Sequence, residues 1–251
     1  MIDIHSHILP GLDDGSASLE DSVAMLRTAA AAGTTDIVAT PHANPEYRFD
    51  PLTVERKISE LQAAAGDAPR IHYGCDFHLT PENIEGALRD REKYTINHKG
   101  YLLVEFSDFL IPKTTDEIFA RLVRARMRPV ITHPERNQIL RKRLADMEAW
   151  VAEGVLLQVT AASFLGRFGR DARRTSEELL SRGLVHFVAS DAHDLHYRTT
   201  ALDEAFHHVS RKFGEEAARR VFEENPRAAL HGVPIPAVPL PIRRRRWYSP
   251  W

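Results

Sequence analysis

The sequence predicts a parallel β/α barrel of seven strand–helix units, a TIM-like (β/α)7 fold with a metal site at the C-terminal strand ends. Short apolar runs alternate with amphipathic stretches of helix length along the 251 residues, and this alternation is typical of α/β folds built on a parallel sheet. Histidines and carboxylates recur where the apolar runs end, and parallel barrels place their active sites at those ends. An open doubly wound sheet is the alternative, but no G-x-G-x-x-G turn follows the first apolar run.

The predicted strands are seven short apolar runs at residues 2–5, 36–40, 71–77, 101–106, 129–132, 155–160 and 185–189. The amphipathic stretches between them predict helices over about 18–32, 51–66, 81–92, 114–127, 141–153 and 171–182, followed by a helical pair near 199–223. Asp21 and Glu117 fall in first turns, where a negative charge suits the helix dipole. Gly33 and Gly154 stand between a predicted helix and the next predicted strand, where a glycine ends the helix.

Composition and charge limit the class of protein. A formal net charge of −2 gives no sign of a nucleic-acid partner, which would require a strongly basic surface. The single cysteine, Cys75, excludes an internal disulfide framework and fits a reducing compartment. The chain opens on Met1-Ile2-Asp3 without the apolar region of a signal peptide, and no apolar run approaches the ~18 residues of a membrane span. We therefore expect a cytoplasmic protein with no membrane span.

The composition changes after Gly232. Four prolines within 233–241 exclude a helix or a central strand and predict an extended segment. The run Arg243–Arg246 follows, which suits peripheral contact with anionic lipid or an acidic partner, and a solvated tail is the alternative. We expect a catalytic domain over 1–232 and a Pro-rich and Arg-rich C-terminal tail over 233–251.

The first strand runs into His5-Ser6-His7. Because successive strand side chains point to opposite faces, His5 and His7 share one face and can bind one cation. Asp191 and His193 repeat this spacing at the end of the last strand. Two such pairs predict a metal site to which both the first and the last strand of the barrel contribute ligands.

Further candidate ligands follow the other strands: Asp13 and Asp14 in the glycine-bounded loop after the first, and His42, Asp76, Glu105 and His133 at the ends of the next four. In a parallel barrel these strand ends converge. A catalytic ion takes about three protein ligands and leaves one position open, so this many candidates predict two or three clustered ions. Imidazole and carboxylate ligands without thiolate suit Mn, Fe or Zn.

In combination these motifs resemble the PHP (polymerase and histidinol phosphatase) superfamily. The segments that carry the resemblance are His5-Ser6-His7, Thr40-Pro41-His42, Tyr73–Asp76, Val104–Ser107, Val130–Arg136 and Ala189–His193. Residues 1–15 and Glu224–Arg227 are similar to the manganese-dependent protein-tyrosine phosphatases of bacterial capsule and exopolysaccharide operons. The resemblance covers about residues 1–231.

That resemblance implies a distorted seven-stranded barrel that holds three divalent ions, with Mn favoured over Fe and Zn. It implies three ligand sets: His5, His7, Asp76 and Asp191 for the first ion; Asp76, Glu105 and His133 for the second; Asp14, His42 and His193 for the third. It also implies that Arg136 and Arg198 bind the substrate phosphate. The family's bridging carboxylate is Glu, and Asp76 is one methylene shorter. We expect His78, two residues further on, to be an ordinary polar residue at the strand exit rather than an auxiliary ligand.

The activity that this resemblance implies is hydrolysis of phosphotyrosine in proteins. Clustered divalent ions lower the pKa of bound water toward neutrality, so a metal-bound hydroxide would attack phosphorus directly while the arginines contact the non-bridging oxygens. The phenolate leaving group has a conjugate-acid pKa of about 10 and needs little help from a general acid. A thiol mechanism is excluded because it needs an arginine six residues after the cysteine, and Pro81 occupies that position after Cys75.

The resemblance implies a tyrosine-phosphorylated protein as the partner, in particular the C-terminal tail of a bacterial tyrosine kinase of capsule or exopolysaccharide synthesis, and it allows a homo-oligomer. Two alternatives stay open. The first is a small-molecule phosphatase of the histidinol-phosphate type on the same fold. The second is a phosphotyrosine-binding regulator with weakened catalysis, motivated by the shorter side chain of Asp76.

Overall fold

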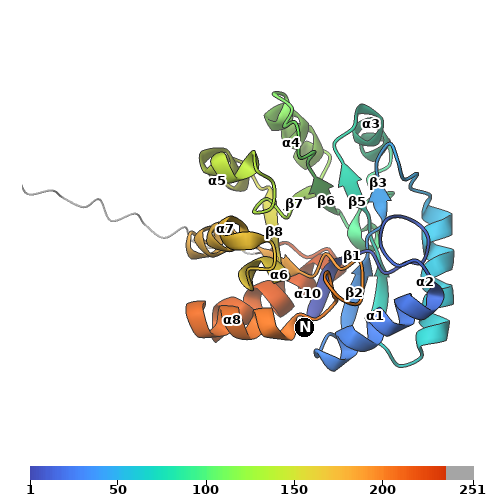
Figure 1. Cartoon of the computed structure of the whole chain (residues 1–251). Helices are drawn as coiled ribbons and strands as arrows, with labels where there is room; N and C mark the ends of the chain where they lie inside the picture. Colours follow the sequence, from blue (N-terminus) through green and yellow to red (C-terminus); the bar gives the residue numbers. More distant parts are fainter. Residues whose placement is uncertain (236–251) are drawn as a thin grey trace, which may run out of the picture.

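The computed structural model describes residues 1–235 and confirms an α/β fold in which helices surround parallel strands (Figure 1). Within these residues one sheet contains three strands in the order β1 (Ile2–Ser6), β2 (Asp36–Ala39) and β4 (Arg70–Tyr73). The other contains six, in the order β3 (His42–Ala43), β5 (Asp76–His78), β6 (Tyr101–Glu105), β7 (Arg128–Thr132), β8 (Leu156–Thr160) and β9 (Phe187–Ala189). The paired strands are parallel in both sheets.

The second sheet begins where the first one breaks. Pro41, which has no N–H to donate, lies between β2 and β3, and Gly74 lies between β4 and β5. A Cβ at position 74 would lie 2.6 Å from Val38 Cγ1, so the absence of a side chain lets the chain pass this close to β2. The predicted strand 71–77 is therefore two strands in two sheets, and the prediction of one continuous strand is wrong at residues 74 and 75.

The first strand also contacts the segment that follows the last one. The Asp191 backbone N–H donates to His5 O at 2.9 Å, and the His7 backbone N–H donates to Ala192 O at 2.8 Å. The two ends of the strand series thus lie side by side, as a barrel-like arrangement requires. Their hydrogen bonds bring the two predicted ligand pairs to the same place.

Six predicted helices have counterparts: α1 (Leu19–Ala31), α2 (Pro51–Ala65), α3 (Pro81–Arg89), α4 (Thr115–Arg124), α5 (Leu144–Ala152) and α7 (Gly169–Ser181). The helical pair corresponds to α8 (Asp203–Phe213) and α9 (Glu215–Arg219), which continue through a π-helical turn, Arg220–Glu224, into α10 (Asn225–His231). The N-terminal ends of α1, α2 and α3 are capped by Ser18, Asp50 and Thr80. Each side chain accepts a hydrogen bond from the backbone N–H three residues later. The short helix α6 (Ala161–Phe164) and α10 escape the sequence prediction, because one or two turns show no clear 3.6-residue period.

Buried side chains gather on both faces of the strands. Leu102 and Val104 of β6 belong to the larger cluster, which includes the buried faces of the surrounding helices. Tyr101 and Leu103 point to the opposite face and belong to a second, inner cluster. Because strand side chains alternate, Glu105 follows Tyr101 and Leu103 onto the inner face. The inner face of the strands is therefore apolar along its length and polar at the end that carries Glu105.

The first residues of the predicted tail contact the domain. The Tyr101 hydroxyl donates to Val233 O at 2.5 Å, and Ile235 packs against the inner cluster. Residues 236–251, which include the predicted lipid or partner contact at Arg243–Arg246, lie outside the described residues. Up to residue 235, no helix combines the length and the apolar character needed to cross a bilayer.

Candidate metal centre

The nine predicted metal ligands meet at one end of the strands, where β1, β6, β7 and β9 end and where β3 and β5 begin. They come from β1 and the loop after it (His5, His7, Asp14), from β3, β5 and β6 (His42, Asp76, Glu105), and from the residues after β7 and β9 (His133, Asp191, His193). Their candidate ligand atoms fall into four groups, and within each group the atoms lie no more than 4.8 Å apart. The groups share members, so the cluster is continuous and can hold more than one metal ion.

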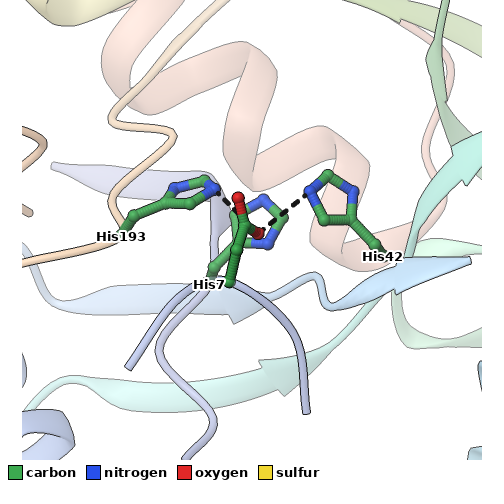
Figure 2. A group of neighbouring side chains, drawn as sticks. His7, His42 and His193 are labelled. Carbon is green, nitrogen blue, oxygen red and sulfur yellow. Dashed lines mark ion pairs between the residues drawn. The ribbon is translucent and has the colours of Figure 1, made fainter. Parts of the chain in front are cut away.

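The outer group contains His7, Asp14, His42 and His193. Figure 2 shows the three imidazole rings converging, with dashed lines from the rings of His42 and His193 to the carboxylate between them. Asp14 Oδ1 lies 3.4 Å from His42 Nε2 and 3.5 Å from His193 Nε2. This group contains the set that was expected for the third ion and adds His7 to it.

His5 and His7 direct one ring nitrogen each toward the same point. Their Nε2 atoms lie 3.2 Å apart, and Asp191 Oδ1 is 3.4 Å from the first and 3.6 Å from the second. The other ring nitrogens are engaged, because His5 Nδ1 donates to Gln158 Oε1 at 3.0 Å and His7 Nδ1 donates to Asp13 Oδ2 at 2.7 Å. These bonds leave the Nε2 lone pairs directed into the cluster, which is the arrangement of metal-ligating histidines.

A further group joins His42, Asp76 and Glu105 to His78, which was expected to be an ordinary polar residue. His42 Nδ1 lies 3.2 Å from Asp76 Oδ2 and 3.5 Å from Glu105 Oε2. His78 Nε2 contacts the same Glu105 oxygen. His133 Nε2 lies 3.4 Å from the other Glu105 oxygen, so Glu105 stands between His78 and His133.

Several of these ligand atoms are buried and lack a hydrogen-bond partner among residues 1–235: His42 Nδ1, both carboxylate oxygens of Asp76, His78 Nε2 and Glu105 Oε2. A buried polar atom without a partner costs about 1–3 kcal/mol, so such atoms call for an explanation, and an ion is one. Imidazole and carboxylate donors around a common centre suit Mn, Fe and Zn. The donor set therefore fits divalent cations.

The electrostatics of the cluster also favour cations. Burial lowers the pKa of His5, but the Asp191 and Asp76 carboxylates outweigh it and raise the pKa to about 9. Burial likewise lowers the pKa of His42, and neighbouring carboxylates raise it to about 11. Burial raises the pKa of Glu105, and the charge on Asp76 adds to the rise. The crowded carboxylates attract positive charge, which either protons on the imidazoles or bound metal ions can supply.

Arg136 and Arg198, the expected phosphate ligands, both reach the cluster. Each donates to Asp191 Oδ2, Arg198 through Nη2 at 2.5 Å. Burial opposes the charge on Asp191, but His5 and the two arginines hold its pKa well below the usual range. Asp191 and His133 have positive φ angles of 52° and 34°, and such strained non-glycine residues concentrate at functional sites. Both guanidinium groups remain partly exposed at the mouth of the cluster.

A cavity of about 230 Å³ opens beside the cluster, and its lining consists of Glu105, Asp108, His133, Arg136, Arg141 and Phe168. The Arg136 guanidinium carbon lies 4.4 Å from the centre of the Phe168 ring, so charge and aromatic ring form one wall. Arg141 and Phe168 were not predicted, because they lie in connections away from the strand ends. Gln158 was also missed, although a polar residue inside an apolar strand is a signal that could have identified it.

A family model described as capsular polysaccharide synthesis, CpsB/CapC, matches residues 1–231. The chain belongs to the CpsB/CapC family. It is 36% identical to CapC of Staphylococcus aureus over 210 residues, 82% of each chain. It is 32% identical over 253 residues, 99% of each chain, to YwqE of Bacillus subtilis, which is named a tyrosine-protein phosphatase.

A solved structure agrees with this assignment. The chain superposes with a TM-score of 0.90 and 33% identity on a chain from the crystal structures of YwqE from Bacillus subtilis and CpsB from Streptococcus pneumoniae, described as unique metal-dependent tyrosine phosphatases. The match covers 97% of this chain and 100% of the other. A TM-score of 0.51 at 15% identity relates the fold alone to the TatD homologue YJJV of Escherichia coli. The resemblance inferred from the motifs is thus confirmed for the CpsB/CapC family.

Proposed function

We propose that the protein is a metal-dependent phosphotyrosine-protein phosphatase of capsule or exopolysaccharide synthesis. The observation that carries the proposal is the shared carboxylate of Asp191. One of its oxygens lies 3.4 Å from His5 Nε2 in the metal centre, and the other accepts from Arg136 and Arg198. A phosphate bound beside Asp191 would have the proposed metal ions on one side and the guanidinium donors of Arg136 and Arg198 on the other. The relatives that are named tyrosine phosphatases support the same activity.

We infer that three divalent ions act here, with Mn favoured and Fe or Zn as the alternatives. The proposed ligands are His5, His7, Asp76 and Asp191 for the first, Asp76, Glu105 and His133 for the second, and Asp14, His42 and His193 for the third. When bound, such ions lower the pKa of the attacking water and neutralise charge on the phosphate. The unpaired, buried ligand atoms of the cluster support their presence.

The side chains of the protein position the substrate. Arg136 and Arg198 bind the non-bridging oxygens through paired N–H donors, which fixes the orientation of the phosphate as well as its charge. Phe168, stacked under Arg136, offers its ring to the aromatic ring of phosphotyrosine in the adjoining cavity. The departing phenolate has a conjugate-acid pKa of about 10, so its release does not depend on a dedicated general acid.

A cysteine-based mechanism finds no support. Cys75 is fully buried in the larger apolar cluster. Burial raises the pKa of its thiol well above the ordinary value. The thiolate that attacks phosphorus in cysteine-dependent phosphatases is therefore not formed here at neutral pH. A single, buried cysteine also fits the cytoplasmic location that we propose.

We propose that the substrate is a tyrosine-phosphorylated protein that presents the modified residue on an extended segment, such as the C-terminal tail of a bacterial tyrosine kinase. The rim of the cavity supports a peptide of this kind. Asp108 lines the cavity, and the next two residues, Phe109 and Leu110, are 92% and 66% exposed. They offer apolar contacts to the residues that flank phosphotyrosine.

The test is a metal titration of the chelator-treated protein with three substrates: a tyrosine-phosphorylated peptide, the matching phosphoserine peptide and histidinol phosphate. We expect hydrolysis that rises with added Mn and a higher kcat/KM for the phosphotyrosine peptide. A preference for histidinol phosphate would replace the proposal with a small-molecule phosphatase. Tight peptide binding without turnover, whichever of Mn, Fe or Zn is added, would replace it with a phosphotyrosine-binding regulator.

A further inference from the structure

His78 lies outside every ligand set that the family resemblance implies, yet strand register places it in the cluster. β5 pairs with β3 so that Asp76 lies beside His42, and with β6 so that His78 lies beside Glu105. Asp76 and His78 are two positions apart on β5 and therefore share a face. Four side chains with metal-binding chemistry thus form one compact patch on three adjacent strands.

The atoms of this patch converge on one point. The ligand atoms of His42, Asp76, His78 and Glu105 all lie within 4.8 Å of one another. His42 uses Nδ1 here, at 3.2 Å from Asp76 Oδ2 and 3.5 Å from Glu105 Oε2, while its Nε2 faces Asp14 in the outer group. One imidazole ring therefore presents a nitrogen to each of two groups.

Within residues 1–235 these atoms make ion-pair contacts with one another but no hydrogen bond. In the part of the chain that the structure describes, His42 Nδ1, both Asp76 oxygens, His78 Nε2 and Glu105 Oε2 are buried without a hydrogen-bond partner. His78 Nε2 and Glu105 Oε2 contact each other, but the contact lacks hydrogen-bond geometry. These atoms are two imidazole nitrogens and the oxygens of two carboxylates around a common centre. A divalent cation bound there would satisfy all of them at once, which their contacts with one another do not.

We propose that His78 is a metal ligand that joins Asp76 and Glu105 at the second of the three proposed ions, where the group also contains Nδ1 of His42. The assignment rests on the proposed metal-dependent function and adds a residue to its site. A second imidazole also alters the metal preference, because nitrogen donors favour ions late in the Irving–Williams order, such as Co²⁺ and Zn²⁺, over Mn²⁺. His78 thus contributes to the choice of ion as well as to its affinity.

The competing role for His78 is to position Glu105 through the contact between the two side chains. Two variants separate the roles. His78→Ala removes both the ligand and the contact, whereas His78→Gln keeps an N–H donor for Glu105 and removes the imidazole nitrogen. His208→Gln is the matched control, because His208 Nε2 lies 3.2 Å from Glu177 Oε1 in a similar His–Glu contact on α8, away from the cluster.

The experiment counts the metal ions bound per chain by elemental analysis after dialysis against Co²⁺ or Mn²⁺, and measures their dissociation constants by calorimetry. We expect both His78 variants to lose one ion per chain or to bind it at least 10–100-fold more weakly, the range found for changes at residues that only support metal ligands. The loss should be larger for Co²⁺ than for Mn²⁺, and the visible Co²⁺ absorption should weaken. His208→Gln should match the wild type.

Wild-type stoichiometry and affinity in His78→Gln would overturn the assignment and leave His78 as a positioning residue. Thermal melting of each variant shows whether its fold is intact. Metal binding is measured without substrate, so the experiment can contradict the proposed phosphatase function without contradicting the ligand role of His78. A wild type that binds the ions but does not hydrolyse phosphotyrosine contradicts the proposed function and leaves the ligand assignment in place. A wild type that binds no divalent ion overturns both.

Discussion

His186, at the residue before β9, contributes to how the stability of the fold responds to acid. Its side chain is buried, and the Leu157 backbone N–H donates to its Nδ1 at 3.1 Å. That nitrogen must stay unprotonated to accept the bond. Burial, with a smaller contribution from the charge of Arg220, lowers the pKa of His186 from 6.5 to about 4. The folded chain therefore keeps a neutral imidazole where the unfolded chain takes up a proton.

The direction of the pH effect follows from this difference. Between about pH 6.5 and pH 4 the unfolded chain binds a proton that the folded chain does not, so acidification lowers the free energy of unfolding. The stability contributed by His186 is fully present above about pH 6.5 and is lost as the pH falls toward 4. A pKa lowered from 6.5 to about 4 corresponds to about 3 kcal/mol over the whole window, and to about 2 kcal/mol between pH 7 and pH 5.

The variant that tests this reasoning is His186→Gln, since the glutamine oxygen can accept from Leu157 but does not titrate. Urea unfolding of both proteins in chelator at pH 7, 6 and 5 gives the comparison, because the titration of the metal centre is then common to both. We expect the wild type to lose about 2 kcal/mol more than His186→Gln between pH 7 and pH 5. Parallel pH dependence in the two proteins would refute the reasoning.

Three further changes test the metal centre. Arg198→Lys keeps the positive charge but loses the planar pair of N–H donors. We expect kcat/KM for an aryl phosphate to fall about 10–100-fold, which corresponds to one charge-assisted hydrogen bond. An unchanged kcat/KM would contradict a phosphate-binding role. Gln158→Leu removes the oxygen that accepts from His5 Nδ1 and should weaken metal binding about 10–100-fold, measured by calorimetry. Gln158→Glu keeps an acceptor and should retain the metal affinity. Equal affinity in the wild type and both variants would count against a role of this hydrogen bond in metal binding. Gly15→Ala places a Cβ against the carbonyl oxygen of His7, so the loop after β1 that carries Asp14 must shift. We expect fewer metal ions bound per chain and a lower melting temperature. An unchanged number of bound ions would show that the loop tolerates the substitution.

Much of the site could be predicted because its ligands follow rules that are local in sequence. His5 and His7 are two apart at the end of an apolar run, and Asp191 and His193 repeat that spacing. Strand geometry alone then places each pair on one face. The convergence of the two pairs needed only the assumption of parallel strands with a common active end.

The remaining features depend on contacts between distant segments. The break at Gly74 occurs where the chain passes against Val38 of a neighbouring strand. A glycine inside the apolar run 71–77 signals a bulge or a close approach, but it does not say which strand lies opposite. The membership of His78 in the cluster depends on the register that sets it beside Glu105. Phe168 lies in the connection between α6 and α7, far in sequence from Glu105 and His133, with which it lines the cavity.

The proposed ions would also stabilise the junction between the two sheets. His5 belongs to the three-stranded sheet, and His42 and Asp76 belong to the six-stranded one, on either side of the breaks at Pro41 and Gly74. A cation held by His5 and Asp76 would link the three-stranded sheet to the six-stranded one. By mass action, metal at a hundredfold excess over its dissociation constant adds about 2.7 kcal/mol to the folded state. Chelation should therefore loosen the junction and lower the melting temperature, so cofactor supply would govern the lifetime of this protein as well as its turnover.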